Sequence, residues 1–217
     1  SGLATDIHVK VSMDGNSWKG NIPSKYKSHA FELEKYIDND RRDPRWIFYT
    51  AQSWHDSAST NDREENLERL RRSIKYYKER VERPDGYPEE IFYSQFRIGA
   101  IMLKMEEPWN LTVNELLKAY NKDPLRAEPF NVIISYYMMM NEFNYAYIYS
   151  KFAYETYHGQ LPQNRLLFVD QSLYMWKIAE MHSSICFYTG KKDESKIAFM
   201  KVKKALNEMP GLFTPDD

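Results

Sequence analysis

The chain has 217 residues, of which 42% are hydrophobic, and its formal net charge is −1 at pH 7. This length suits one domain or slightly more. A charge so close to zero gives no general attraction to nucleic acid or to anionic lipid surfaces. Cys186 is the single cysteine, which excludes an internal disulfide and favours a reducing compartment, so we expect a cytoplasmic protein. No apolar run approaches the ~20 residues that span a membrane, and no signal peptide is recognisable.

The first 25 residues are interpreted as a β segment and linker. Ile7, Val9 and Val11 alternate with polar residues, a strand pattern of period two, and Asp14-Gly15-Asn16 predicts a turn. Because a lone strand cannot satisfy its own backbone groups, this one either pairs within a local hairpin or is the remnant of an upstream domain. Ser1-Gly2 is typical of residues left by an expression tag, so we expect a piece of a longer protein.

Residues 26–210 have a helical pattern, and residues 211–217 form a tail. Proline and glycine divide the pattern, with Pro44 and Pro88 at expected helix starts. Thr112 and Glu115 have the spacing of a capping box, which predicts a helix start at Thr112. We expect helices at residues 28–36, 44–54, 62–83, 88–103, 112–122, 126–140, 143–157, 170–188 and 193–208.

The stretch from Arg126 to Tyr157 is similar to one tetratricopeptide (TPR) repeat, a helix–turn–helix unit of about 34 residues. Small residues on its second helix let the first helix approach, and aromatic residues fill the remaining volume. Ile134 and Ser150 depart from the pattern. The residues that match it are Ala127, Phe130, Ile133, Tyr137, Phe143, Ala146 and Ala153.

Other helix pairs align with the same pattern at irregular spacing. Ala51, Gly99, Ile134 and Ser183 take the equivalent place near the middle of each first helix. Gly99 is expected where two helices approach most closely, since a side chain there would push them apart. The sequence therefore predicts an all-α fold, a TPR-like antiparallel helix-pair array of about four degenerate repeats, preceded by a short β segment.

Four short motifs in one order resemble the helical segment that follows the catalytic domain of some bacterial and phage-type nucleotide-sugar glycosyltransferases. The resemblance covers residues 18–209 and implies a non-catalytic accessory domain, whose sugar-transfer chemistry would lie in a preceding domain. The motifs are Arg45 to Ser53, Ile74 to Arg80, Glu89-Glu90, and Arg126 to Pro129.

We find no arrangement that predicts catalysis, a metal or a cofactor in this chain. Asp38-Asn39-Asp40 matches the D-x-D signature of such transferases, but it follows a helix and precedes two arginines, which favours a solvated helix end. His182 and Cys186 lie four residues apart on one helical face. That spacing could pair a thiol with a base, although a small core residue beside a hydrogen-bonded histidine explains it better.

Two functional hypotheses follow. The first is a glycosyltransferase accessory domain for assembly or for binding a protein or glycan acceptor. The alternative is a TPR-type adaptor that binds a peptide or protein partner. Neither involves nucleic acid or a membrane span.

The resemblance to TPR arrays implies that the first helix of each repeat lines a concave groove. Aromatic faces beside amide and charged groups suit a sugar or a peptide, but the aromatics could instead pack against the next repeat, and inserted loops could cover the groove. The expected groove residues are Arg45, Phe48, Gln52, His55 and Asp56 in the first repeat, Tyr93, Phe96 and Lys104 in the second, and Glu128, Asn131, Ser135 and Met138 in the third.

Overall fold

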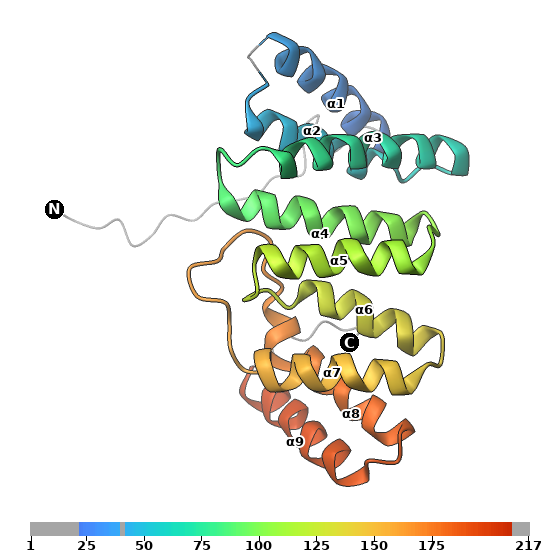
Figure 1. Cartoon of the computed structure of the whole chain (residues 1–217), viewed down its shortest axis with the longest axis vertical. Helices are drawn as coiled ribbons and strands as arrows, with labels where there is room; N and C mark the ends of the chain where they lie inside the picture. The colour runs from blue at the N-terminus through green and yellow to red at the C-terminus, as the bar shows by residue number, and fades with distance from the viewer. Residues whose placement is uncertain (1–21, 40–41, 210–217) are drawn as a thin grey trace, which may run out of the picture. The chain divides into compact units, whose positions relative to one another are not determined.

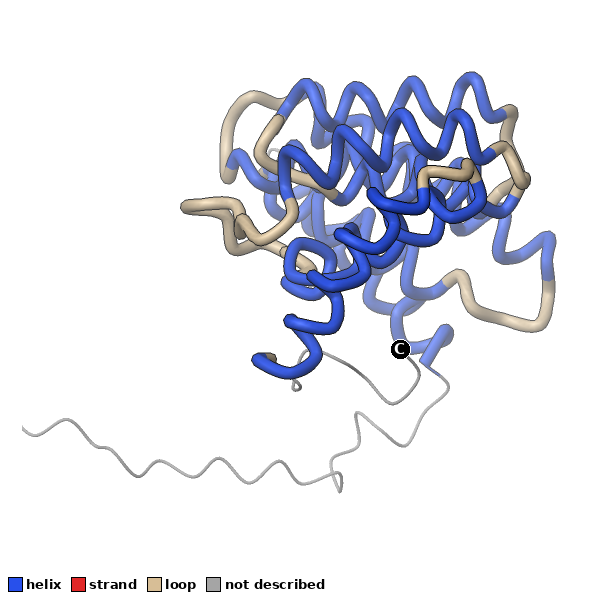
Figure 2. The backbone as a smooth tube through the Cα atoms, turned by 90° about the horizontal axis from the view of Figure 1, so that it is seen from below, coloured by secondary structure: helices blue, strands red, loops and turns tan. Residues whose placement is uncertain are grey.

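Helices dominate the computed structural model, which describes residues 22–39 and 42–209. No residue of these two ranges is in a strand, and Figure 2 shows only helices and loops there. The expected β segment lies outside the described residues, as does Asp40 of the D-x-D match. The helices are α1 (Ile22–Asn39), α2 (Pro44–Ser57), α3 (Arg63–Glu82), α4 (Pro88–Lys104), α5 (Trp109–Lys122), α6 (Glu128–Met139), α7 (Phe143–Tyr157), α8 (Ile178–Tyr188) and α9 (Lys192–Glu208).

The predicted all-α, TPR-like array of antiparallel helix pairs is confirmed. The chain forms two compact units, Ser1–Ser73 and Ile74–Asp217, whose boundary falls within α3. In the second unit α4 packs on α5, α6 on α7 and α8 on α9, as Figure 1 shows. No helix of the described residues is both long and apolar enough to cross a membrane.

The first unit packs around Trp54, which is 1% exposed. The edge of Phe31 meets its ring at 5.0 Å between centroids, and the Arg72 guanidinium lies 4.7 Å over it. Its indole nitrogen donates to Glu34 at 2.9 Å. Trp54 of α2 therefore contacts α1 through Phe31 and Glu34, and the first part of α3 through Arg72.

The core of the second unit follows the repeat pattern. Ala127, Ala146 and Ala153 are fully buried, so the small residues do lie where helices approach. Around them pack Phe130 from α6, Tyr157 from α7 and the residues that precede and form α8.

One local prediction was wrong. Helix α5 begins at Trp109, because the Pro108 carbonyl accepts the amides of Leu111 and Thr112 and closes a turn before Thr112. Thr112 is therefore a buried residue inside the helix and does not cap it. The helix expected at residues 170–188 is present, and it contains a π-helical turn, η2 (Leu173–Lys177), which no periodicity indicated.

Gly99 lies at the close approach of α4 and α5, as predicted. A Cβ atom there would lie 2.7 Å from the Leu116 side chain and 3.2 Å from the Leu116 amide nitrogen. We expect Gly99→Leu to lower the free energy of unfolding by about 1–3 kcal/mol, because the backbone of α5 would have to move. A denaturant titration measures this change. Ala100→Leu, at the adjacent half-buried residue, is the control and should cost less; equal losses would contradict the close approach.

Candidate functional site

The groove residues expected in the first unit differ in their exposure. Phe48 is 1% exposed and packs beside Tyr49, which favours a packing role over contact with a ligand. Arg45 is exposed, with its guanidinium 5.7 Å over the Tyr49 ring. Gln52 is half-buried, and His55 Nδ1 lies 2.9 Å from the Asp56 carboxylate. That these residues bind a ligand stays a prediction.

In the second unit the first helices of successive pairs do lie side by side. Helix α4 contacts α6, and α6 contacts α8. The expected groove residues of two repeats lie on α4 and α6. They are Tyr93, Phe96 and Lys104 on α4 and Glu128, Asn131, Ser135 and Met138 on α6.

Residues 158–172, between α7 and η2, cover one end of this face. The Glu89 carboxylate at the start of α4 accepts the amides of Leu166 and Leu167 at 2.9 and 2.8 Å. Phe168 stacks on Tyr93 with 4.3 Å between ring centroids. The segment therefore contacts α4 at its amino-terminal end and covers Tyr93, one of the expected groove residues.

Phe168 adopts a left-handed backbone conformation with φ of +53°. An aromatic residue rarely takes it, and such a conformation costs roughly 1–3 kcal/mol. Its stacking on Tyr93 and the hydrogen bond from Arg126 to its carbonyl offset that cost. The path of this segment is thus set by tertiary contacts and not by local preference.

A buried ion pair holds the covered end together. Arg126 is fully buried and binds the Glu128 carboxylate through two hydrogen bonds of 3.0 and 2.9 Å. The burial of Glu128 means that it contributes to this pair rather than to an open groove. Arg126 also donates to the carbonyls of Leu167 and Phe168 at 3.1 and 3.3 Å, and lies 4.6 Å over the Phe92 ring. The charge is therefore fully paired, as a buried charge must be.

A cavity of about 610 Å³ opens next to this network. It lies between the first turns of α4, the end of α5 and residues Asn164 and Arg165. Arg165 pairs with Asp123, Tyr87 donates to Glu89, and Lys122 is exposed. This cavity could not be predicted from the sequence, since its walls come from three segments far apart in the chain.

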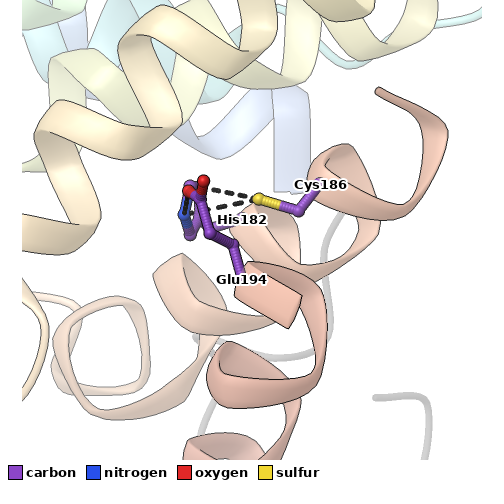
Figure 3. A group of neighbouring side chains, drawn as sticks. All are labelled: His182, Cys186 and Glu194. Atoms are coloured by element: carbon purple, nitrogen blue, oxygen red, sulfur yellow. Dashed lines mark hydrogen bonds and ion pairs between the residues drawn. The ribbon is translucent and has the colours of Figure 1, made fainter. Parts of the chain in front are cut away.

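His182 and Cys186 are buried together, with Nε2 3.5 Å from Sγ, and Glu194 of α9 joins them (Figure 3). Burial raises the pKa of the Cys186 thiol to about 11 and lowers the pKa of His182. Such a thiol stays protonated at neutral pH and is not an activated nucleophile. The four-residue spacing of His182 and Cys186 is visible in the sequence, but nothing in the sequence predicts that Glu194 lies beside them. It comes close because Gly190, at φ of +77°, turns the chain directly from α8 into α9.

The anchor of residues 158–172 is expected to weaken in acid. Burial alone would raise the pKa of Glu89, but hydrogen bonds from Tyr87 and the amides of Leu167 and Leu166 outweigh it, so the pKa lies below its ordinary value. A carboxylate of this kind adds stability above its unfolded pKa, and the gain is lost as pH falls through the folded value. Protection of the Leu166 and Leu167 amides from hydrogen exchange should therefore be constant near neutral pH and fall in acid.

Two substitutions isolate the carboxylate in that measurement. Glu89→Met removes both acceptor atoms at similar volume and should reduce protection of the two amides at neutral pH. Glu107→Met, at an exposed carboxylate between α4 and α5, should leave protection unchanged. Equal protection in wild type and Glu89→Met would contradict the anchor.

The fold is similar to solved structures of MamA. The crystal structure of MamA has a TM-score of 0.58 and 11% identity, covering 93% of this chain and 99% of that chain. The structure of MamA AMB-1 has a TM-score of 0.50 and 16% identity, covering 85% of this chain and 91% of that chain. At these identities the likeness establishes the fold alone. No protein-family model matches the chain, and no curated protein sequence matches it.

The resemblance to a glycosyltransferase accessory domain is wrong. The chain aligns over 99% and 91% of the two solved MamA chains, and neither a catalytic domain nor a glycan acceptor gains support. The motifs behind the resemblance have structural roles instead: Arg80 pairs with Glu90 at 3.1 Å, and Arg126 pairs with Glu128. Two of the four motifs that resemble the glycosyltransferase segment thus contain arginines that form buried ion pairs in this fold.

Proposed function

We propose that the chain is a TPR-type adaptor that binds a peptide or protein partner on the open part of the face formed by α4 and α6. The fold that it shares with MamA supports a binding role over an enzymatic one. A shared fold does not locate a binding site, so the site is inferred from the exposed residues of α4 and α6.

The observation that carries the proposal is the contrast between the two ends of that face. Residues 158–172 cover the end that carries Glu89, Tyr93 and Arg126. At the opposite end, Met139 is 67% exposed and Ser135 is exposed beside half-buried Met138. Thioether side chains adapt to varied apolar partners, and a hydroxyl adds a hydrogen-bonding group.

The chemistry of the open end favours a partner with apolar side chains and a carboxylate. The repeat pattern assigns Lys104 to the same face, and it is an exposed residue in the last turn of α4. Asn131 supplies a half-buried amide on α6. An apolar and acidic segment would bury its side chains on Met138 and Met139 and place its carboxylate near Lys104.

A displayed peptide library selected on the whole chain, followed by affinity measurement of the selected peptides, tests this proposal. We expect Met139→Glu to weaken binding at least tenfold (~1.4 kcal/mol), because a carboxylate would replace an apolar contact and repel an acidic peptide. Lys104→Glu should weaken binding as well.

Matched substitutions elsewhere provide the controls. Met200→Glu changes a methionine of α9 that is 63% exposed, and Lys122→Glu changes the exposed lysine in the last turn of α5. Both should leave affinity unchanged. Selected peptides that bind Met139→Glu as tightly as wild type, or that lose affinity only with the α9 control, would overturn the assignment of the face.

A further inference from the structure

Three side chains of different metal-ligand types gather where α8 meets α9. The ligand atoms of His182, Cys186 and Glu194 all lie within 4.8 Å of one another. Figure 3 shows them converging from two neighbouring helices. His182 is 2% exposed and Cys186 is fully buried, while the Glu194 side chain is 42% exposed and reaches solvent. The cluster thus has a buried floor and an accessible side through which an ion could enter.

The separations fit a tetrahedral zinc ion. Zn–S bonds of about 2.3 Å and Zn–N bonds of about 2.0–2.1 Å place the sulfur and nitrogen about 3.6 Å apart. Cys186 Sγ lies 3.5 Å from His182 Nε2. The sulfur is also 3.8 Å from Nδ1, so the imidazole has to turn before the Nε2 lone pair points at the shared position.

Glu194 completes the set after a modest movement. Its Oε2 lies 3.9 Å from His182 Nε2, about 0.5 Å beyond the separation that tetrahedral zinc requires. Because the side chain is half-exposed and belongs to the first turn of α9, a change of rotamer can close that gap without moving the helix.

Neighbouring side chains contact the imidazole and the carboxylate. Ser150 Oγ lies 3.0 Å from His182 Nδ1, which leaves Nε2 as the nitrogen for a metal. The Tyr154 ring stacks on the imidazole at 4.8 Å between centroids, and the Tyr147 hydroxyl donates to Glu194 at 2.9 Å. Outer contacts of this kind fix ring orientation and ligand basicity in metal sites.

We propose that His182, Cys186 and Glu194 bind a zinc ion, with the fourth position open to solvent. On binding, the Cys186 thiol loses its proton to water as the Zn–S bond forms. The thiolate, the carboxylate and Zn²⁺ then sum to zero charge, which lowers the cost of holding them in a buried place. A thiolate and an imidazole select a borderline-soft ion such as zinc over Mg²⁺ or Ca²⁺, which prefer oxygen ligands.

Two lysines oppose the ion. Lys151 Nζ is 3.7 Å from Glu194 Oε2, and Lys191 Nζ lies 4.4 Å over the Tyr147 ring. Lys151 competes directly for the carboxylate that the metal needs. Removing its charge should therefore tighten metal binding, an effect that a purely structural role of the cluster does not produce.

Cobalt(II) titration of the whole, chelator-treated chain tests the proposal, since Co²⁺ takes zinc sites and reports its ligands by absorption. We expect the visible bands of tetrahedral Co²⁺ together with a thiolate-to-cobalt charge-transfer band, both abolished by one equivalent of Zn²⁺. Cys186→Ser should remove the charge-transfer band, and Ser150→Ala should weaken binding about 10–100-fold as loss of an outer contact does.

Substitutions at half-exposed or exposed residues are not expected to unfold the chain, so they test metal binding separately from stability. Glu194→Gln should weaken Co²⁺ binding at least tenfold, whereas Glu155→Gln, at the 64% exposed carboxylate also beside Lys151, should leave it unchanged. Lys151→Met should tighten binding several-fold. Absence of the charge-transfer band in the wild type, or equal affinity in wild type and Glu194→Gln, would overturn the site.

Discussion

The buried charge of Arg126 is the constraint on which much of the second unit depends. A guanidinium removed from water must recover its lost hydration from the protein, and removal of one partner of such a pair typically costs about 3–5 kcal/mol. Glu128 supplies two hydrogen bonds, the carbonyls of Leu167 and Phe168 supply two more, and Glu89 lies 3.7 Å away. Tyr174 extends the network, since its hydroxyl accepts the Ala127 amide and donates to Glu128. A single side chain thus fixes α4, α6, η2 and the segment before it in one arrangement.

The helix pairs could be predicted because their determinants are local and periodic. Ala146 and Ala153 recur at the spacing of a packed face, and Gly99 lies where Leu116 of α5 leaves no room for a side chain. The path of residues 158–172 could not be predicted, because it depends on Glu89, which is distant in sequence, and on a backbone angle at Phe168 that an aromatic residue seldom adopts.

The candidate sites were predictable to different degrees. The spacing of His182 and Cys186 was visible in the sequence, whereas their neighbour Glu194 depends on how tightly the chain turns at Gly190. The repeat pattern assigned the expected groove residues to α4 and α6, and these two helices do contact each other. The repeat pattern could not predict that Met138 and Glu128 differ in exposure. Met138 is half-buried at the open end, whereas Glu128 is buried because it pairs with Arg126. Periodicity predicts the helix face on which a residue lies, but an ion pair can determine whether its side chain is exposed or buried.

The long sequence separation of these contacts has a consequence for how the second unit folds. Helix pairs such as α4 and α5 join residues close in the chain, while the bond from Leu166 to Glu89 closes 77 residues and that from Tyr174 to Glu128 closes 46. Loop-closure entropy delays such contacts until the helices have docked. We therefore expect residues 158–172 to become ordered after the helix pairs have docked. We also expect this segment to open locally while the helices stay packed.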